Sequence, residues 1–287
     1  MDKKMSKLVD DFQSGRIERR DFIKKLSILT GGTAAALGLL PLLDSQSVNA
    51  SALSLDEEDV LSEFITYPGA TGEVIALLSR PKGEKKLPAV IVIHENKGLQ
   101  PHIQDVNKRM AKEGFLAIAP DALSPLGGTP IDDVDGARTK LRELDGEQTT
   151  KDFVAAVKYL DTHPLSTGKV GCTGFCWGGA LTNQVAVNAP DLDAAVPYYG
   201  RQPVPEDVPK IKAAVMAHYA GDDERINAGI EAFEKAMKEA DIEYQIFVYE
   251  GAQHAFNNDS NPSRYHEEAA KLAWKRTIGF FKEKLKS

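Results

Sequence analysis

The stretch Gly174-Phe175-Cys176-Trp177-Gly178-Gly179 decides the fold. It ends an apolar run over 170–175 and precedes a helical pattern over 179–188. The string has the G-x-S-x-G form of a nucleophile elbow, a tight turn from strand to helix, with cysteine in the serine position. Small residues flank Cys176 because a Cβ atom there would collide with neighbouring backbone. A lone match is equally compatible with a plain turn around a small buried cysteine, so the rest of the chain has to decide.

Short strands alternate with helices on both sides of this turn. Apolar, β-branched runs bounded by Gly, Pro or Asp predict buried parallel strands, and strands that alternate with helices predict a mostly parallel, doubly wound α/β sheet. Two leading strands should pair antiparallel at one edge, since the few residues between them cannot form a parallel crossover. The expected strands are 63–67, 72–79, 89–93, 115–119, 170–175, 194–199, 213–218 and 245–249, and the expected helices are 103–113, 148–162, 179–188, 228–240 and 264–284.

An acid and then a histidine follow the elbow along the chain, each after a predicted strand. The string Gly-Asp-Asp-Glu-Arg-Ile, with Asp222 and Asp223, comes after the next strand but one, and His254 comes after the last strand. Nucleophile, acid, histidine is the chain order of α/β-hydrolases, and active sites gather at the carboxyl ends of parallel strands. We therefore expect Cys176 as nucleophile, with His254 either as its general base or in an ion pair with its thiolate, and an aspartate orienting the imidazole. Spacing alone does not separate Asp222 from Asp223.

A further polar segment, His94-Glu95-Asn96-Lys97-Gly98, follows the first long core strand. The loop at this place often supplies an oxyanion donor, so the backbone N–H groups of Asn96 and Trp177 are the candidate oxyanion hole. The start of the helix after Cys176 should also favour a thiolate, because a helix N-terminus carries partial positive charge. The segment is not a zinc-protease motif, since Gly98 stands where H-E-x-x-H needs its second histidine.

Together these segments resemble the dienelactone hydrolase, or carboxymethylenebutenolidase, family over roughly residues 60–284. The shared motifs are H-E-x-x-G at 94–98, G-x-C-x-G-G at 174–179, an acid followed by two variable residues and an aliphatic one, and G-A-x-H at 251–254. The resemblance implies an α/β-hydrolase fold and cleavage of ester or lactone bonds through a cysteine nucleophile. It selects Asp223 as the acid. It also implies that Glu95 hydrogen-bonds the resting thiol and helps to deprotonate it when substrate enters.

Departures from the family pattern leave the substrate open. Family members that act on dienelactone hold its carboxylate with arginines, one of them four residues after the catalytic histidine, where this chain has Asn258; the serine that follows the histidine is Ala255 here. Arg138 and Arg142 could supply another anchor or could lie on an exposed helix face. A broader carboxylesterase or peptidase, or a catalytically silent ligand-binding protein, would share this fold.

The composition of the chain limits the classes of ligand and partner that we expect. The 287 residues carry a net charge of -7, and Lys and Arg form no stripe, so we expect a small-molecule ester or lactone rather than nucleic acid. Two cysteines are too few for a disulfide framework or a four-cysteine zinc site, and no G-x-G-x-x-G motif is present, so no cofactor or metal is expected. Cys172, the second cysteine, should be a small buried residue of the strand before the elbow.

The first fifty residues have the form of an export signal. Arg-Arg-Asp-Phe-Ile-Lys at 19–24 resembles the twin-arginine signal, an uncharged apolar stretch spans 26–43, and Val-Asn-Ala at 48–50 suits cleavage after Ala50. We therefore expect a signal peptide over 1–50, one α/β-hydrolase domain over 51–287, the twin-arginine export machinery as a partner, and a periplasmic enzyme without stable membrane association. The alternative is an uncleaved anchor, since the apolar stretch is borderline in length.

Overall fold

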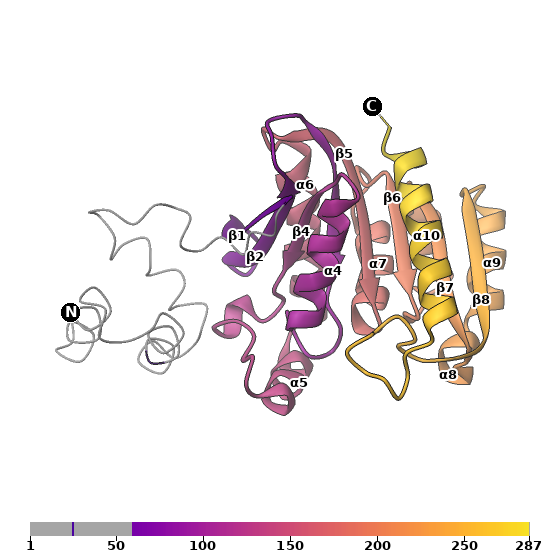
Figure 1. The fold of residues 1–287 in the computed structure, drawn as a ribbon. Coiled ribbons are helices and arrows are strands. Elements are labelled where there is room, and N and C mark those ends of the chain that lie inside the picture. The colour runs from indigo at the N-terminus through magenta and orange to yellow at the C-terminus, as the bar shows by residue number, and fades with distance from the viewer. Residues whose placement is uncertain (1–24, 26–58, 287) are drawn as a thin grey trace, which may run out of the picture.

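The computed structural model describes Lys25 and residues 59–286, and the expected leader otherwise lies outside the described residues. One eight-stranded sheet, ordered β1-β2-β4-β3-β5-β6-β7-β8, organises this part of the chain (Figure 1). The strands are β1 (Val60–Pro68), β2 (Glu73–Pro81), β3 (Leu87–Ile93), β4 (Leu116–Pro120), β5 (Ser166–Phe175), β6 (Ala194–Tyr198), β7 (Ala214–Asp222) and β8 (Tyr244–Gln253). The helices are α4 (Pro101–Lys112), α5 (Val134–Glu143), α6 (Gly146–Asp161), α7 (Trp177–Asn188), α8 (Glu224–Asn227), α9 (Ile230–Glu239) and α10 (Glu267–Lys284), with 3-10 turns at Ser124–Leu126 and Val208–Lys210.

The sheet is mixed at one edge and parallel elsewhere. β1 pairs antiparallel with β2, and β2 antiparallel with β4, whereas every pairing from β4 to β8 is parallel. The short turn between β1 and β2 is closed by the Gly69 N–H, which donates to the Gly72 carbonyl at 2.8 Å. The predicted α/β class and the antiparallel leading strands are therefore confirmed.

Helices cover both faces of the sheet and create two apolar cores. Along β3, Ile91 and Ile93 belong to the core shared with α6, α7 and α9, whereas Val90 and Val92 belong to the core shared with α4 and α10. Figure 1 shows α4 and α10 in front of the sheet and α7 behind it. Because successive side chains of a strand point to opposite faces, a strand buried on both faces reads as a continuous apolar run.

Two helical features differ from the prediction. Helix α5 was not among the expected helices; only Ala137 and Leu141, one turn apart, are buried on it, so its apolar stripe is short. Its N-cap is Asp133, whose carboxylate accepts a hydrogen bond from the Gly136 N–H at 2.8 Å. The helix expected over 228–240 corresponds to α9, which begins two residues later than expected, after its N-cap Gly229. The short helix α8, which precedes it, was not expected.

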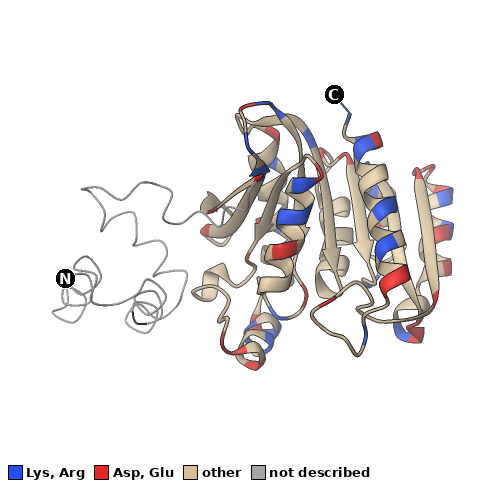
Figure 2. Cartoon of the chain, in the orientation of Figure 1, with Lys and Arg blue, Asp and Glu red and all other residues tan. Residues whose placement is uncertain are grey.

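Charged residues of both signs are interspersed along the helices, as Figure 2 shows for α5 and α10. Several form pairs one turn apart, such as Lys151 with Glu147 at 2.6 Å on α6. Among residues 59–286, no helix combines the length and the apolar character that crossing a membrane requires.

Candidate active site

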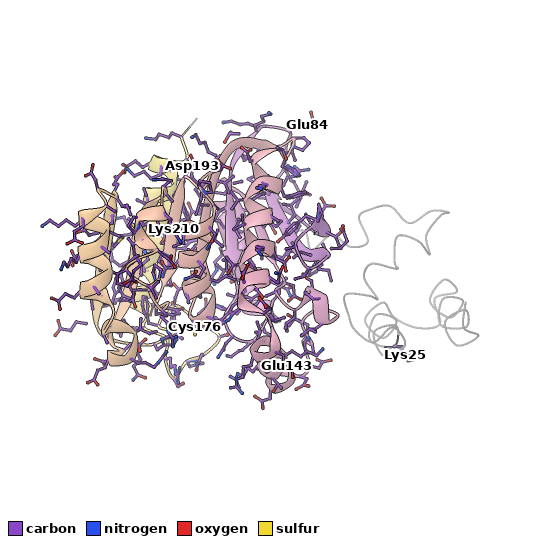
Figure 3. The ribbon with its side chains drawn as sticks, turned by 180° about the vertical axis from the view of Figure 1, so that it is seen from behind. Lys25, Glu84, Glu143, Cys176, Asp193 and Lys210 are labelled. Atoms are coloured by element: carbon purple, nitrogen blue, oxygen red, sulfur yellow. The ribbon has the colours of Figure 1, made fainter. Side chains whose placement is uncertain are left out.

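The expected site residues follow four strands, and all of them lie at the same end of those strands. Cys176 follows β5, Asp223 follows β7, His254 follows β8, and Glu95 comes two residues after β3. In Figure 3, Cys176 lies toward one end of the molecule and Asp193, which precedes β6, lies toward the other. Cys176 lies at the carboxyl ends of the parallel strands. Open α/β sheets bind their ligands at this end of the strands.

The elbow at Cys176 is sterically tight. Cys176 has φ 57° and ψ -110°, a conformation that a non-glycine residue adopts only at a cost, and its N–H donates to the Tyr198 carbonyl at 3.0 Å. A Cβ atom on Gly178 would lie 2.4 Å from the His94 carbonyl oxygen, and one on Gly174 would lie 2.3 Å from the Gly178 carbonyl oxygen. The two glycines of the motif are therefore required by the close approach of backbone to backbone.

His254 joins the thiol to an aspartate. Its Nε2 lies 3.0 Å from the Cys176 Sγ, and its Nδ1 lies 2.5 Å from the Asp223 Oδ2. Asp222 is exposed at the end of β7, so the tertiary structure separates the two acids that spacing could not. Because a carboxylate only accepts, the Asp223 contact fixes the proton on Nδ1 and turns the Nε2 lone pair toward the thiol.

The Cys176 thiol is held in its neutral form. Burial, followed by the charge of Glu95, raises the pKa of the Cys176 thiol to about 11, whereas the Trp177 N–H and the charge of Arg225 lower it. The Trp177 N–H at the start of α7 thus favours the thiolate, in the expected direction. Desolvation of the sulfur and a nearby carboxylate outweigh this contribution, so the net result is a thiol.

Glu95 contacts Asn258 in place of the thiol. The Glu95 side chain is only 7% exposed, and its Oε2 accepts a hydrogen bond from the Asn258 Nδ2 at 2.8 Å. The Asn258 Oδ1 accepts from the Ser260 N–H at 3.0 Å, which fixes the orientation of the amide. The sequence had singled out Asn258 only as a departure from the family pattern, by its place four residues after His254.

His94 connects the two segments of the expected oxyanion hole, a role that the sequence did not suggest. Its Nδ1 donates to the Glu95 carbonyl at 2.7 Å, because its Nε2 accepts from the Ala122 N–H at 3.1 Å. The buried ring stacks on Trp177 with 5.2 Å between ring centroids. His94 thus packs the peptide that leads into Asn96 against the first residue of α7, while the Asn96 side chain itself is exposed.

The other residues noted in the sequence lie away from this arrangement. Arg138 pairs with Asp135 on its own helix at 2.8 Å, and Arg142 is exposed on the same helix, α5. Cys172 is a buried free thiol whose Sγ lies 3.8 Å from the Thr182 hydroxyl, and burial raises its pKa to about 12. Within residues 59–286, no group of three or more His, Cys, Asp and Glu side chains is placed to hold a metal ion.

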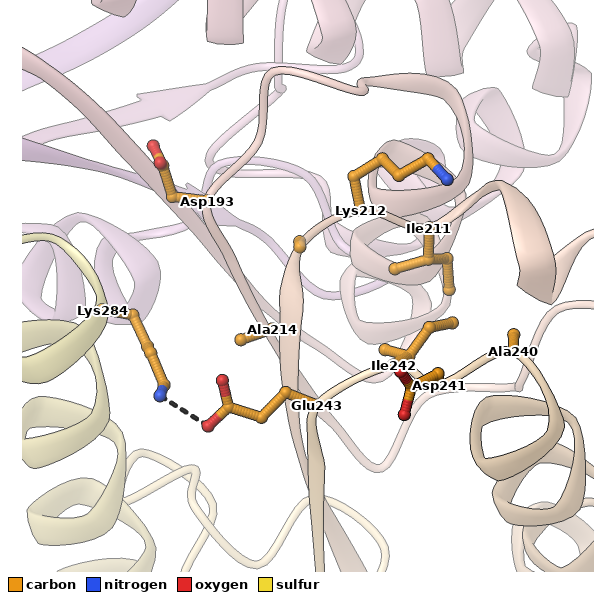
Figure 4. Close-up of a pocket in the computed structure, with 10 residues that line it drawn as sticks. Asp193, Ile211, Lys212, Ala214, Ala240, Asp241, Ile242, Glu243 and Lys284 are labelled. Atoms are coloured by element: carbon orange, nitrogen blue, oxygen red, sulfur yellow. Dashed lines mark hydrogen bonds and ion pairs between the residues drawn. The ribbon is translucent and has the colours of Figure 1, made fainter.

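Two pockets help to locate the site. A pocket of about 200 Å³ adjoins Trp177 and is bounded by α6, α7 and the residues after β6; its lining is Gly146, Thr149, Thr150, Trp177, Ala180, Leu181, Gln184, Arg201 and Gln202. A pocket of about 460 Å³ lies at the opposite edge, where β6, β7 and β8 begin (Figure 4). There the Lys284 ammonium pairs with Glu243 at 2.5 Å. Of these two pockets, only the first includes a residue of the candidate site, Trp177.

Comparisons with known proteins agree with this geometry. A model of the dienelactone hydrolase family matches residues 74–285. A provisionally named carboxymethylenebutenolidase of Yersinia pestis is 34% identical over 232 residues, which cover 75% of this chain and 86% of that protein.

Solved structures extend the comparison. A provisionally assigned dienelactone hydrolase of Klebsiella pneumoniae is 29% identical with a TM-score of 0.68 and covers 77% of this chain and 98% of its own. A dienelactone hydrolase of Anabaena variabilis, 18% identical with a TM-score of 0.63, covers 80% of this chain and 100% of its own and shares the fold. Fold, motifs and relatives thus agree, and the chain belongs to the dienelactone hydrolase family of hydrolytic enzymes.

Proposed function

We propose that the protein hydrolyses ester or lactone bonds through a thioester formed on Cys176. The observation that carries this proposal is the continuous line of contacts from Sγ through the His254 imidazole to Asp223, with 3.0 Å and 2.5 Å separating the successive pairs of atoms. A nucleophile, a base and a group that orients the base are what acyl transfer needs, and each lies at a strand end.

In the first half of the reaction, His254 acts as a general base. Since the pKa of the thiol is raised, Cys176 enters as S–H, and Nε2 removes the proton as the sulfur attacks the carbonyl carbon. The resulting tetrahedral oxyanion is stabilised by the N–H groups of Trp177 and Asn96. Collapse breaks the bond to the leaving oxygen, which takes the proton from His254 and leaves an acyl thioester on Cys176.

Hydrolysis of the thioester completes the cycle. His254 removes a proton from water, the hydroxyl oxygen attacks the acyl carbon, and the second tetrahedral intermediate forms in the same oxyanion hole. Its collapse releases the carboxylic acid and returns the proton to the sulfur. Asp223 keeps Nδ1–H oriented through both halves and stabilises the imidazolium that forms in each.

The test uses initial rates of the full chain on a panel of activated esters and carboxymethylenebutenolide. We expect Cys176→Ala to abolish turnover and Cys172→Ala, which removes the other buried thiol of the chain, to retain it. Mass spectrometry of the enzyme mixed with a slowly hydrolysed ester should find the acyl group on the peptide that contains Cys176. Undiminished turnover by Cys176→Ala would refute the mechanism.

Export is a separate proposal that rests on the sequence of residues 1–50. The twin-arginine-like string at 19–24 is followed by an apolar stretch and a small-residue cleavage site. We expect the mature chain in the periplasmic fraction of its native host, and replacing both arginines by lysine should retain it inside. Equal export of the double-lysine variant would contradict the twin-arginine route.

A further inference from the structure

The carboxylate of Glu95 lies among uncharged groups. Its hydrogen-bond partner is the neutral amide of Asn258, which is 2% exposed, and no ion pair to Glu95 forms within residues 59–286. The neighbouring Cys176 is a neutral thiol, because burial, followed by the charge of Glu95, raises its pKa. A buried carboxylate is usually accompanied by a cation, so this one places an uncompensated negative charge beside the nucleophile.

His102 does not supply the missing positive charge. It lies close enough for the charge of Glu95 to act on its imidazole, but burial dominates and lowers the pKa of His102 below its ordinary value. The Nδ1 of His102 also lies 3.1 Å from Asp259, whose carboxylate is paired with Arg109 at 3.3 Å and so does not call for a positive charge on His102. At neutral pH, His102 is therefore predominantly uncharged.

One polar group near the site is uncharged. The Tyr199 hydroxyl is buried, and its ring lies 5.1 Å from that of His254. Burial raises the pKa of Tyr199 well above its ordinary value, and the charge of Glu95 raises it further, so the hydroxyl keeps its proton. Tyr199 therefore adds neither a positive nor a negative charge to the site.

Cations at this edge of the sheet lie on its rim. Arg201 and Arg225, which follow β6 and β7, are both exposed, and Lys97 is partly exposed. Exposed cations are screened by water and salt, whereas the buried Glu95 is screened much less. A negative charge on the substrate would therefore be repelled near Cys176 more strongly than the rim could attract it.

We infer that this site prefers uncharged esters and lactones over carboxylate-bearing counterparts of the same shape, and that Asn258 is the residue that sets this preference by giving Glu95 a neutral partner. The inference rests on the proposed function and specifies its substrate class. A carboxylate entering beside Glu95 would bring two like charges together in a partly desolvated space, which disfavours binding and the transition state alike.

The experiment compares carboxymethylenebutenolide with its methyl ester. The two lactones differ at one position, which is a charged carboxylate in the first and an uncharged ester in the second. For each, kcat/KM of the full chain is divided by the rate constant for hydrolysis by hydroxide, which removes the difference in intrinsic reactivity. We expect the normalised ratio of methyl ester to acid to exceed about tenfold in the unmodified protein.

Two substitutions test the role of Asn258 in opposite directions. Asn258→Arg should lower the ratio by about tenfold or more, because it gives Glu95 a cationic partner, and the near-isosteric Asn258→Asp should raise it. A ratio at or below one in the unmodified protein would overturn the inference whatever the variants do, as would a ratio that both active variants leave unchanged. If the proposed function itself is wrong, the result is different, because neither lactone would then be cleaved in a reaction that depends on Cys176.

Discussion

Burial and nearby charges set the protonation state of Cys176. Burial raises the pKa of the thiol most, Glu95 and Asp223 raise it further, and the Trp177 N–H and Arg225 lower it. In the proposed mechanism, Cys176 is therefore a thiol that needs a base rather than a preformed thiolate. The proposed base is His254, whose Nδ1 contacts the carboxylate of Asp223. Two predictions at this scale separate the roles of these acids.

Asp223 should be essential where its neighbour is not. We expect Asp223→Asn to lower kcat by about 10²–10⁴, because an amide in that place can stabilise the wrong imidazole tautomer and cannot stabilise the imidazolium. Asp222→Asn, a matched change of an exposed acid, should leave kcat within about twofold. Steady-state rates on one activated ester are sufficient, and the reverse order of the two effects would show that Asp222 is the functional acid.

Glu95 should control the acidity of the thiol. Alkylation by iodoacetamide needs the thiolate, so its rate rises with pH toward the pKa of Cys176, which is raised to about 11. Glu95→Gln removes a negative charge that contributes to this rise, so the profile should move to lower pH and alkylation at pH 8 should be faster. The measurement is made in a Cys172→Ala background to follow one thiol. A profile that stays in place or moves upward would contradict an electrostatic role of Glu95.

At the level of elements, the turn between β5 and α7 is the most constrained connection in the site. Its glycines lie against the backbone of β3 and of the turn itself, whereas Gly279 on α10 is exposed and a Cβ atom there meets nothing within 4 Å. Two glycine substitutions in the same protein should therefore act in opposite directions.

Gly178→Ala should destabilise the fold by roughly 1–3 kcal/mol and reduce turnover, since the new Cβ atom would lie 2.4 Å from the His94 carbonyl oxygen and displace the elbow. Gly279→Ala should stabilise the fold by ~0.5–1 kcal/mol, because alanine has the higher helix propensity at an unobstructed helical position. Urea unfolding of both variants provides the test. Equal destabilisation by both would mean that helix propensity and backbone clearance do not explain the two sites.

Across the whole molecule, a buried polar network joins β7 and β8 to α10. The His218 Nε2 lies 3.0 Å from the Thr277 hydroxyl, and its Nδ1 lies 2.9 Å from the Tyr249 hydroxyl. The imidazole is fully buried, and burial lowers the pKa of His218 to about 3. The network therefore requires neutral histidine, which ties the stability of the fold to pH.

The sign of that dependence follows from linkage. The folded-state pKa of about 3 lies below the ordinary value of 6.5, so the unfolded chain binds more protons between these limits. The contribution of His218 is fully present above pH 6.5 and should be lost at up to ~1.4 kcal/mol per pH unit as the pH falls toward 3. Urea unfolding of the unmodified protein and of His218→Gln between pH 7 and pH 4.5 tests this, and equal slopes in the two would contradict it.

The sequence by itself determined the α/β class, the antiparallel edge and the family, because apolar runs, glycine spacing and motif order are local or ordered along the chain. It also placed Cys176, His254 and Glu95 at strand ends. Helix α5 was not predicted, since only two of its residues are buried and its apolar stripe is short. For the acid, the local spacing allowed both Asp222 and Asp223, and only the resemblance to the family favoured one of them.

Tertiary structure alone decided which groups meet and what charge they carry. The contacts of Asp223 with His254 and of Glu95 with Asn258 join residues 31 and 163 positions apart, and no local pattern encodes such pairings. The neutral thiol of Cys176 is equally a tertiary property, because its pKa depends on burial and on carboxylates contributed by other strands. The sequence thus determined where the chemistry is located, and the packing of distant strand ends set its protonation states, because desolvation and Coulomb energy depend on distances in space.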